Sequence, residues 1–261
     1  MTTTITQPVG TADSTSPDVM FPAIPFSRLL RVEWGKATDT RASRWLLAAV
    51  AASTVGLMLA PILSPSSIEQ SYTSYLGFAA VALSILLPVV AILTLTSEWS
   101  QRTNLTTFTQ EPRRMRVVIA KIVVSLMLGV GAAVFGALVT AAGLGVAAAS
   151  GRTLDADLSI GLMVAFVAYV LLNIMTGVAL GALVHNSAAA IVASFVLPIG
   201  FALLGQASQL VANWLDYSTA FTWLLNGQWS GHTAQILVAV ALWVAAPLAV
   251  GLVRTVRREI N

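Results

Sequence analysis

The sequence contains no cysteine, and only 10% of its 261 residues are charged, compared with about 25% in soluble domains. Without cysteine the chain has no disulfide framework, no thiolate metal site and no thiol nucleophile. The scarcity of charge excludes an ordinary water-exposed surface for most of the chain. Because 57% of the residues are hydrophobic, the composition predicts a protein whose solvent is largely lipid.

Ionisable residues are also missing from the middle of the long apolar segments, where they are costly and usually functional, so we do not expect a proton relay. The two histidines, His185 and His232, are predicted to lie on opposite faces of the membrane and cannot share a metal ion. The Gly35-Lys36 pair lacks the upstream glycine of a phosphate-binding loop. We therefore predict no catalytic, cofactor-binding or metal-binding residue, and we do not expect the chain to be an enzyme.

Six apolar segments recur along the chain, and each is long enough to cross the roughly 30 Å hydrocarbon layer as a helix. The predicted spans cover residues 45–63, 77–96, 122–149, 158–184, 188–211 and 234–253. The sequence thus predicts an all-α, polytopic membrane protein with one membrane domain. Residues 1–25 are rich in Pro, Thr and Ser and are expected to form a disordered cytoplasmic tail. The aromatic-rich segment 212–233 is expected to dip into the membrane interface as short helices.

Basic residues gather beside the spans on one predicted side of the membrane, which marks the cytoplasmic side. Of the fourteen Lys and Arg residues, all except Arg152 precede span one, lie between spans two and three, or follow span six. This distribution predicts that both chain ends are cytoplasmic (N-in, C-in). The same basic residues are not interleaved with aromatics on a soluble surface, so no nucleic-acid partner is expected.

Residues 26–44 show helical periodicity immediately before the first span. Apolar Phe26, Leu29, Leu30 and Trp34 recur against basic Arg28, Arg31 and Lys36. This pattern predicts an amphipathic interfacial helix in contact with anionic membrane lipids. An ordinary solvated helix is the alternative.

The segment between spans two and three is the one substantial cytoplasmic loop that we predict. Glu98 and Arg102 are four residues apart, a spacing that supports an ion pair on a helix. A Thr-rich stretch and a basic run then lead to span three, and the residues concerned are Thr103, Thr106, Thr107, Pro112, Arg113, Arg114, Arg116 and Lys121. One interpretation is a charge cluster that only fixes the topology. The other is a docking element that a soluble partner can push.

This loop resembles that of the permease subunits of type-2 ATP-binding-cassette (ABC) exporters. Those proteins show an acidic residue, a Thr or small-residue stretch, Pro-x-x-Arg and a late Ala-Lys. The counterparts in this chain are Glu98, Thr103, Pro112 with Arg113 and Arg114, and Ala120-Lys121. The resemblance also covers the architecture: an amphipathic N-terminal helix, six spans and a membrane-dipping segment before the last span.

The resemblance implies that residues 26–261 form an ABC type-2 transporter transmembrane domain in the cell membrane. Its implied partners are two ABC ATPase subunits, which would bind ATP and Mg²⁺, and a second permease copy or a paralogue. The chain itself would hold no cofactor and would form the export path for a hydrophobic or amphiphilic substrate, with spans two and five at the dimer axis. The alternative is a non-transporting membrane scaffold or regulatory subunit that binds a cytoplasmic partner through the basic loop.

Overall fold

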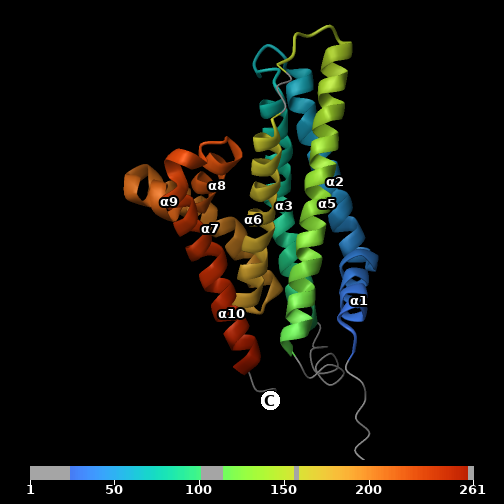
Figure 1. Cartoon of the computed structure of the whole chain (residues 1–261), viewed down its shortest axis with the longest axis vertical. Coiled ribbons are helices and arrows are strands. Elements are labelled where there is room, and N and C mark those ends of the chain that lie inside the picture. The colour runs from blue at the N-terminus through green and yellow to red at the C-terminus, as the bar shows by residue number, and fades with distance from the viewer. Residues whose placement is uncertain (1–23, 101–113, 156–158, 258–261) are drawn as a thin grey trace, which may run out of the picture.

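The computed structural model describes residues 24–100, 114–155 and 159–257 (Figure 1). Within these ranges six helical segments are long and apolar enough to cross a membrane: Arg41–Leu63, Tyr72–Glu98, Met115–Ala149, Ile160–Val184, Ser187–Ala207 and Trp229–Thr255. Each predicted span falls on one of these segments. The fold is therefore that of an all-α, multi-pass membrane protein, as the sequence predicts.

The first helices in chain order are α1 (Phe26–Asp39), α2 (Arg41–Leu63), α3 (Tyr72–Ser100), α5 (Arg114–Ala149), α6 (Ile160–Val184) and α7 (Ser187–Ala207). The predicted dipping segment contains η1 (Val211–Leu215), a π-helical turn, and the short helix α8 (Tyr217–Leu225). The last span is built from α9 (Trp229–Val240), the π-helical turn η2 (Ala241–Ala245) and α10 (Ala246–Arg257). Short helices thus occur where the aromatic-rich segment predicts them.

Side chains that accept hydrogen bonds from the first turn set where several helices begin. Thr40 Oγ1 accepts from the backbone N–H of Ser43 at 3.1 Å, and Asn186 Oδ1 accepts from that of Ala189 at 3.0 Å. Thr40 has an extended backbone, so it separates α1 from α2. The amphipathic helix therefore ends at Asp39, before the limit that the sequence suggests at residue 44.

The centre of the bundle is the packing of α3 against α6, and both helices are largely buried by their neighbours. Their backbones come very close at Gly177, where an added Cβ atom would clash with the backbone of Pro88, including its carbonyl oxygen. Only glycine fits this position without moving a backbone. The close packing of α3 against α6 therefore depends on the glycine at position 177.

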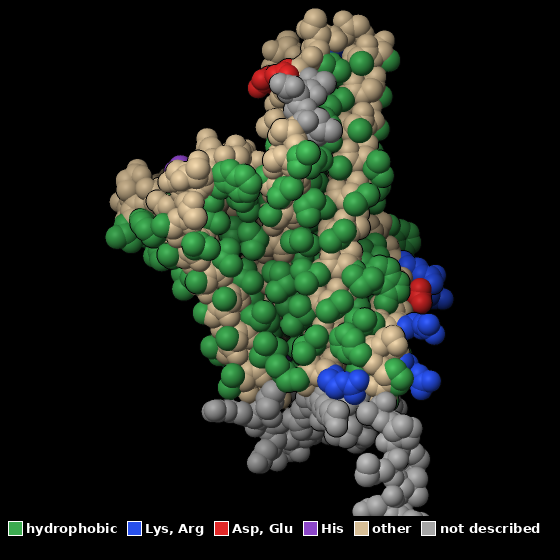
Figure 2. Space-filling model, in the orientation of Figure 1, with side chains coloured by type: hydrophobic (Ala, Val, Ile, Leu, Met, Phe, Trp, Pro, Cys, Tyr) green, Lys and Arg blue, Asp and Glu red, His purple; other side chains and the backbone are tan. Residues whose placement is uncertain are grey.

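One end of the bundle carries α1, the start of α5 and the end of α10 (Figure 1). We call this end the inner end, because the charge distribution predicts that it faces the cytoplasm, and the opposite end the outer end. Hydrophobic side chains cover the face between the two ends, and Lys and Arg side chains gather at the inner end beside them (Figure 2). The chain thus returns to the inner end after its last span, as an even number of spans requires.

Candidate functional site

The side of α1 that is buried against the rest of the protein includes a carboxylate, that of Glu33. Leu29, Glu33 and Ala37 recur every four residues and are buried, mainly against α5. Only 2% of Glu33 is exposed. A buried carboxylate needs a charged or hydrogen-bonding partner to offset its lost hydration, so the surroundings of Glu33 mark a candidate site.

Lys121, near the start of α5, is the first partner of Glu33. Its Nζ donates to Glu33 Oε2 at 2.7 Å and to the backbone oxygen of Thr94 at 3.2 Å. The same Nζ lies 3.6 Å from Glu98 Oε2, at the end of α3. Lys121 is only 3% exposed. One buried ammonium therefore connects α1, α3 and α5.

Lys36 closes the arrangement from the side of α1. Its Nζ donates to Glu33 Oε1 at 2.7 Å and to Glu98 Oε1 at 2.6 Å. Glu33, Lys36, Glu98 and Lys121 thus form a ring in which each cation contacts both anions, and we call these four residues the charge quartet. Burial alone would lower the pKa of Lys36, but its hydrogen bonds to Glu33 and Glu98 outweigh that effect and raise the pKa above the ordinary value.

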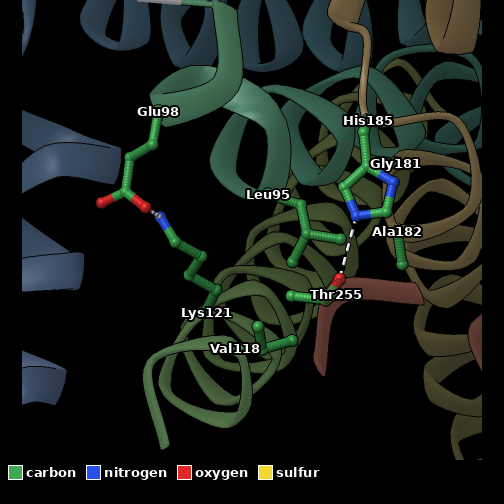
Figure 3. A pocket seen from close by; sticks show the side chains of 8 residues that line it. All are labelled: Leu95, Glu98, Val118, Lys121, Gly181, Ala182, His185 and Thr255. Carbon is green, nitrogen blue, oxygen red and sulfur yellow. Dashed lines mark hydrogen bonds and ion pairs between the residues drawn. The ribbon is translucent and has the colours of Figure 1, made fainter. Parts of the chain in front are cut away.

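A small pocket adjoins the quartet on the side facing α6 and α10 (Figure 3). Its lining residues are Leu95, Glu98, Val118, Lys121, Gly181, Ala182, His185 and Thr255. Glu98 and Lys121 point toward each other on one side, His185 points toward Thr255 on the other, and Leu95 and Val118 lie between the two pairs (Figure 3). The pocket therefore separates the quartet from a second polar contact, in which His185 Nε2 lies 2.9 Å from Thr255 Oγ1.

The tight turn between α6 and α7 is held from two sides. His185 adopts a left-handed conformation with φ of 53° and ends α6. Thr96 Oγ1 on α3 lies 2.7 Å from Ser187 Oγ, and Arg254 Nη1 on α10 donates to the oxygen of Leu183 at 2.8 Å. A second set of polar contacts, separate from the quartet, therefore joins the α6–α7 turn to α3 and α10.

The predicted loop residues fall in two groups. Arg102, Thr103, Thr106, Thr107, Pro112 and Arg113 lie outside the residues that the structure describes. Arg114 begins α5, Arg116 Nη2 donates to the oxygen of Ile24 at 2.6 Å, and Glu98 and Lys121 belong to the quartet. The structure thus joins the two described ends of the loop directly, through an ion pair.

The residues predicted on the interfacial helix fall into two groups. Arg28, Arg31 and Trp34 are exposed. Lys36 is also partly exposed, but it reaches Glu98 and joins the quartet. Glu33 is the member that the sequence analysis missed. Its position four residues after Leu29 and four before Ala37 places it on the apolar stripe of an amphipathic helix, and this was the available signal.

Among the described residues, no group of three or more His, Cys, Asp or Glu side chains is placed to hold a metal ion. His232 stacks on the ring of Trp223 with a centroid distance of 4.0 Å. The quartet itself joins α1, α3 and α5 through ion pairs.

Comparisons with known proteins leave the interpretation of the site to its geometry. No model of a known protein family matches the chain, and a search of curated proteins finds no match.

Proposed function

We propose that the chain is the permease subunit of an ATP-driven exporter in the cell membrane, of the type-2 ABC kind that its loop motif resembles. In this proposal the quartet is the element through which a partner ATPase acts on the spans. ATP and Mg²⁺ would be bound by that partner, and a second permease copy or a paralogue would complete the translocation path.

The observation that carries the proposal is the placement of the quartet at both ends of the loop. Residues 101–113 connect α3 to α5, and Glu98 and Lys121 flank this segment within 3.6 Å of each other. Both are also joined to α1, through Lys36 and Glu33 respectively. A push on the loop must therefore be shared among three helices or must break buried ion pairs.

Buried ion pairs favour a few distinct packings of the helices over a continuous range of intermediate packings. Separating Glu98 from Lys36 and Lys121 would leave a buried carboxylate without its cationic partners, which is costly. A packed helix bundle held in this way is expected to switch between alternative packings rather than deform continuously. Such two-state behaviour is what alternating inward-open and outward-open states require.

Exposed apolar side chains on α3 and α7 support the proposal of a hydrophobic or amphiphilic substrate. On α7 the side chains of Val192, Val196, Ile199 and Leu203 are exposed, and on α3 those of Val81 and Ile85 are exposed. These helices pack against each other. Their outward faces suit a hydrophobic or amphiphilic substrate and contact with a second permease copy.

The test is transport and ATP hydrolysis in vesicles containing the full chain and the ATPase subunits that co-purify with it. Glu98→Gln should abolish cargo-stimulated hydrolysis and vectorial transport while the complex still assembles. Glu69→Gln makes the same chemical change at an exposed residue of the outer end and should leave both activities unchanged. A partner that binds without transport in any vesicle would instead indicate a scaffold or regulatory subunit.

A further inference from the structure

The outward face of α1 and the start of α2 carry an excess of positive charge. Arg28, Arg31 and Arg41 are exposed, and none has an acidic partner in the part of the chain that the structure describes. Arg44 lies 3.8 Å from Asp39, and this pair is well exposed. The other acidic residues of the region, Glu33 and Glu98, are committed to the buried quartet.

Exposed aromatic and aliphatic side chains lie between these arginines. Trp45 is 78% exposed, and Val32, Trp34 and Phe26 are also exposed. Arginine beside tryptophan is typical of the boundary between lipid headgroups and hydrocarbon, because both side chains place a polar tip at the headgroups and an apolar body below them. A soluble acidic protein would not require the exposed Trp45, which begins the first apolar run.

We propose that this surface, which we call the α1 face and define by Arg28, Arg31, Trp34, Arg41 and Trp45, binds the headgroups of anionic phospholipids. The occupant is the leaflet next to the inner end, since span one leaves the α1 face directly into the bilayer. The opposite side of α1 carries Glu33 and Lys36, so lipid contact also fixes the helix that supplies half of the quartet. The proposal does not depend on the export function.

The absence of cysteine from the chain permits a clean test. Ala42→Cys, an exposed position beside Arg41, is labelled with bimane in the full chain and reconstituted without any ATPase. Quenching is compared between vesicles in which either phosphatidylglycerol or phosphatidylcholine carries brominated acyl chains, at the same mixing ratio. A label at Ser66→Cys, in the exposed outer loop, is the matched control.

We expect brominated phosphatidylglycerol to quench the label at position 42 more strongly than phosphatidylcholine, with no such preference at position 66. Each arginine near an anionic surface contributes roughly a fivefold preference, so Arg28→Gln and Arg31→Gln together should lower it by roughly 25-fold and leave only the smaller preference due to Arg41. Asp39→Asn should increase the preference, and high salt should reduce it. Equal quenching by the two lipids at position 42, or a preference that the double substitution does not lower, would overturn the proposal.

Because the assay contains no ATPase, its outcome is separate from that of the transport test. A lipid preference with no transport would retain the α1 face and reject the exporter. Transport without a lipid preference would support the exporter and reject the α1 face as a lipid-binding surface.

Discussion

The two ends of the helix bundle are held together by different chemistry. Among the described residues, the charge quartet joins three helices at the inner end, whereas at the outer end the guanidinium of Arg152 binds neutral oxygens of α2 and of the segment that follows it. Arg152 donates to the backbone oxygens of Pro61 and Ile62 at 3.3 and 2.7 Å, and to Gln70 Oε1 at 3.2 Å. The two backbone oxygens belong to the last turn of α2, whose carbonyls lack intrahelical donors and attract a cation.

This difference determines what each end can do when helices move. A neutral carbonyl near the aqueous surface can return to water at little cost, but a buried carboxylate that loses its cation cannot. The outer end can therefore open one hydrogen bond at a time. At the inner end the quartet residues are expected to separate together or not at all, which is why we place the coupling element there.

The largest expected effect tests this asymmetry directly. Lys121→Met removes the buried cation that Glu33 and Glu98 share, leaves the partly exposed Lys36 as their remaining cation in the quartet, and should lower the free energy of unfolding by about 3–5 kcal/mol. The measurement is unfolding by SDS in mixed micelles, followed by circular dichroism.

The control for Lys121→Met removes the stranded charge as well. In Glu33→Gln combined with Lys121→Met, the remaining Lys36 and Glu98 still balance each other at 2.6 Å. This double variant should be more stable than Lys121→Met alone, because one carboxylate then pairs with Lys36 instead of two carboxylates sharing it. If the loss in the double variant equals the sum of the losses in Glu33→Gln and Lys121→Met, the two charges act independently. The proposed difference between the inner and outer ends would then fail.

A second prediction concerns the packing that connects the two ends. Gly177→Ala places a methyl group against the backbone of Pro88 and must push α3 away from α6, at a cost of about 1–3 kcal/mol. Gly131→Ala is the matched control, since a Cβ atom there meets no neighbour within 4 Å. It should be neutral or slightly stabilising in the same unfolding assay, because alanine favours the helix. Equal losses in the two variants would show that the α3–α6 contact is not specific.

The sequence predicts the helical framework well because hydropathy is a local property. A run of about twenty apolar residues identifies a span without knowledge of its neighbours, and all six spans were found in this way. The break at Thr40 was missed, although a threonine three residues before Ser43 is a capping signal. Hydropathy averaged over a long window does not detect a single cap.

The candidate site was only partly predictable because its members are distant in the sequence. Lys36, Glu98 and Lys121 were each singled out from local patterns, but nothing in those patterns pairs them. Glu33 and Lys121 are separated by 88 positions, and only the packing of α1 against α5 brings them together. The sequence does contain one partial signal for this pairing: Lys36 and Lys121 are the only lysines in the chain, and both belong to the quartet.

A third prediction measures the outer end by the same assay. Arg152→Gln removes the guanidinium that links the loop after α5 to the end of α2, and should cost about 1–2 kcal/mol, because its acceptors can be solvated once it is gone. The backbone pairing of Tyr72 N–H with the oxygen of Asp155, at 3.0 Å, should keep the loop in place. A loss as large as that of Lys121→Met would show that the outer end is no more tolerant of change than the inner end.

The smallest expected effect is the loss of stability at high pH, because a lysine such as Lys36 can lose its charge in this range whereas an arginine such as Arg152 cannot. The pKa of Lys36 is raised in the folded protein, so its contribution to stability is fully present below the unfolded value of about 10.4 and is lost as the pH rises through the folded pKa. The loss should stay below about 1 kcal/mol, because 39% of the Lys36 side chain is exposed and solvent screens its ion pairs. Lys36→Arg keeps its charge at these pH values, so its melting temperature should fall less than that of the wild type between pH 10 and about 11.5. Parallel curves for the two proteins would show that the quartet does not depend on the charge of Lys36, and that the inner end, like the outer, is held without a titrating cation.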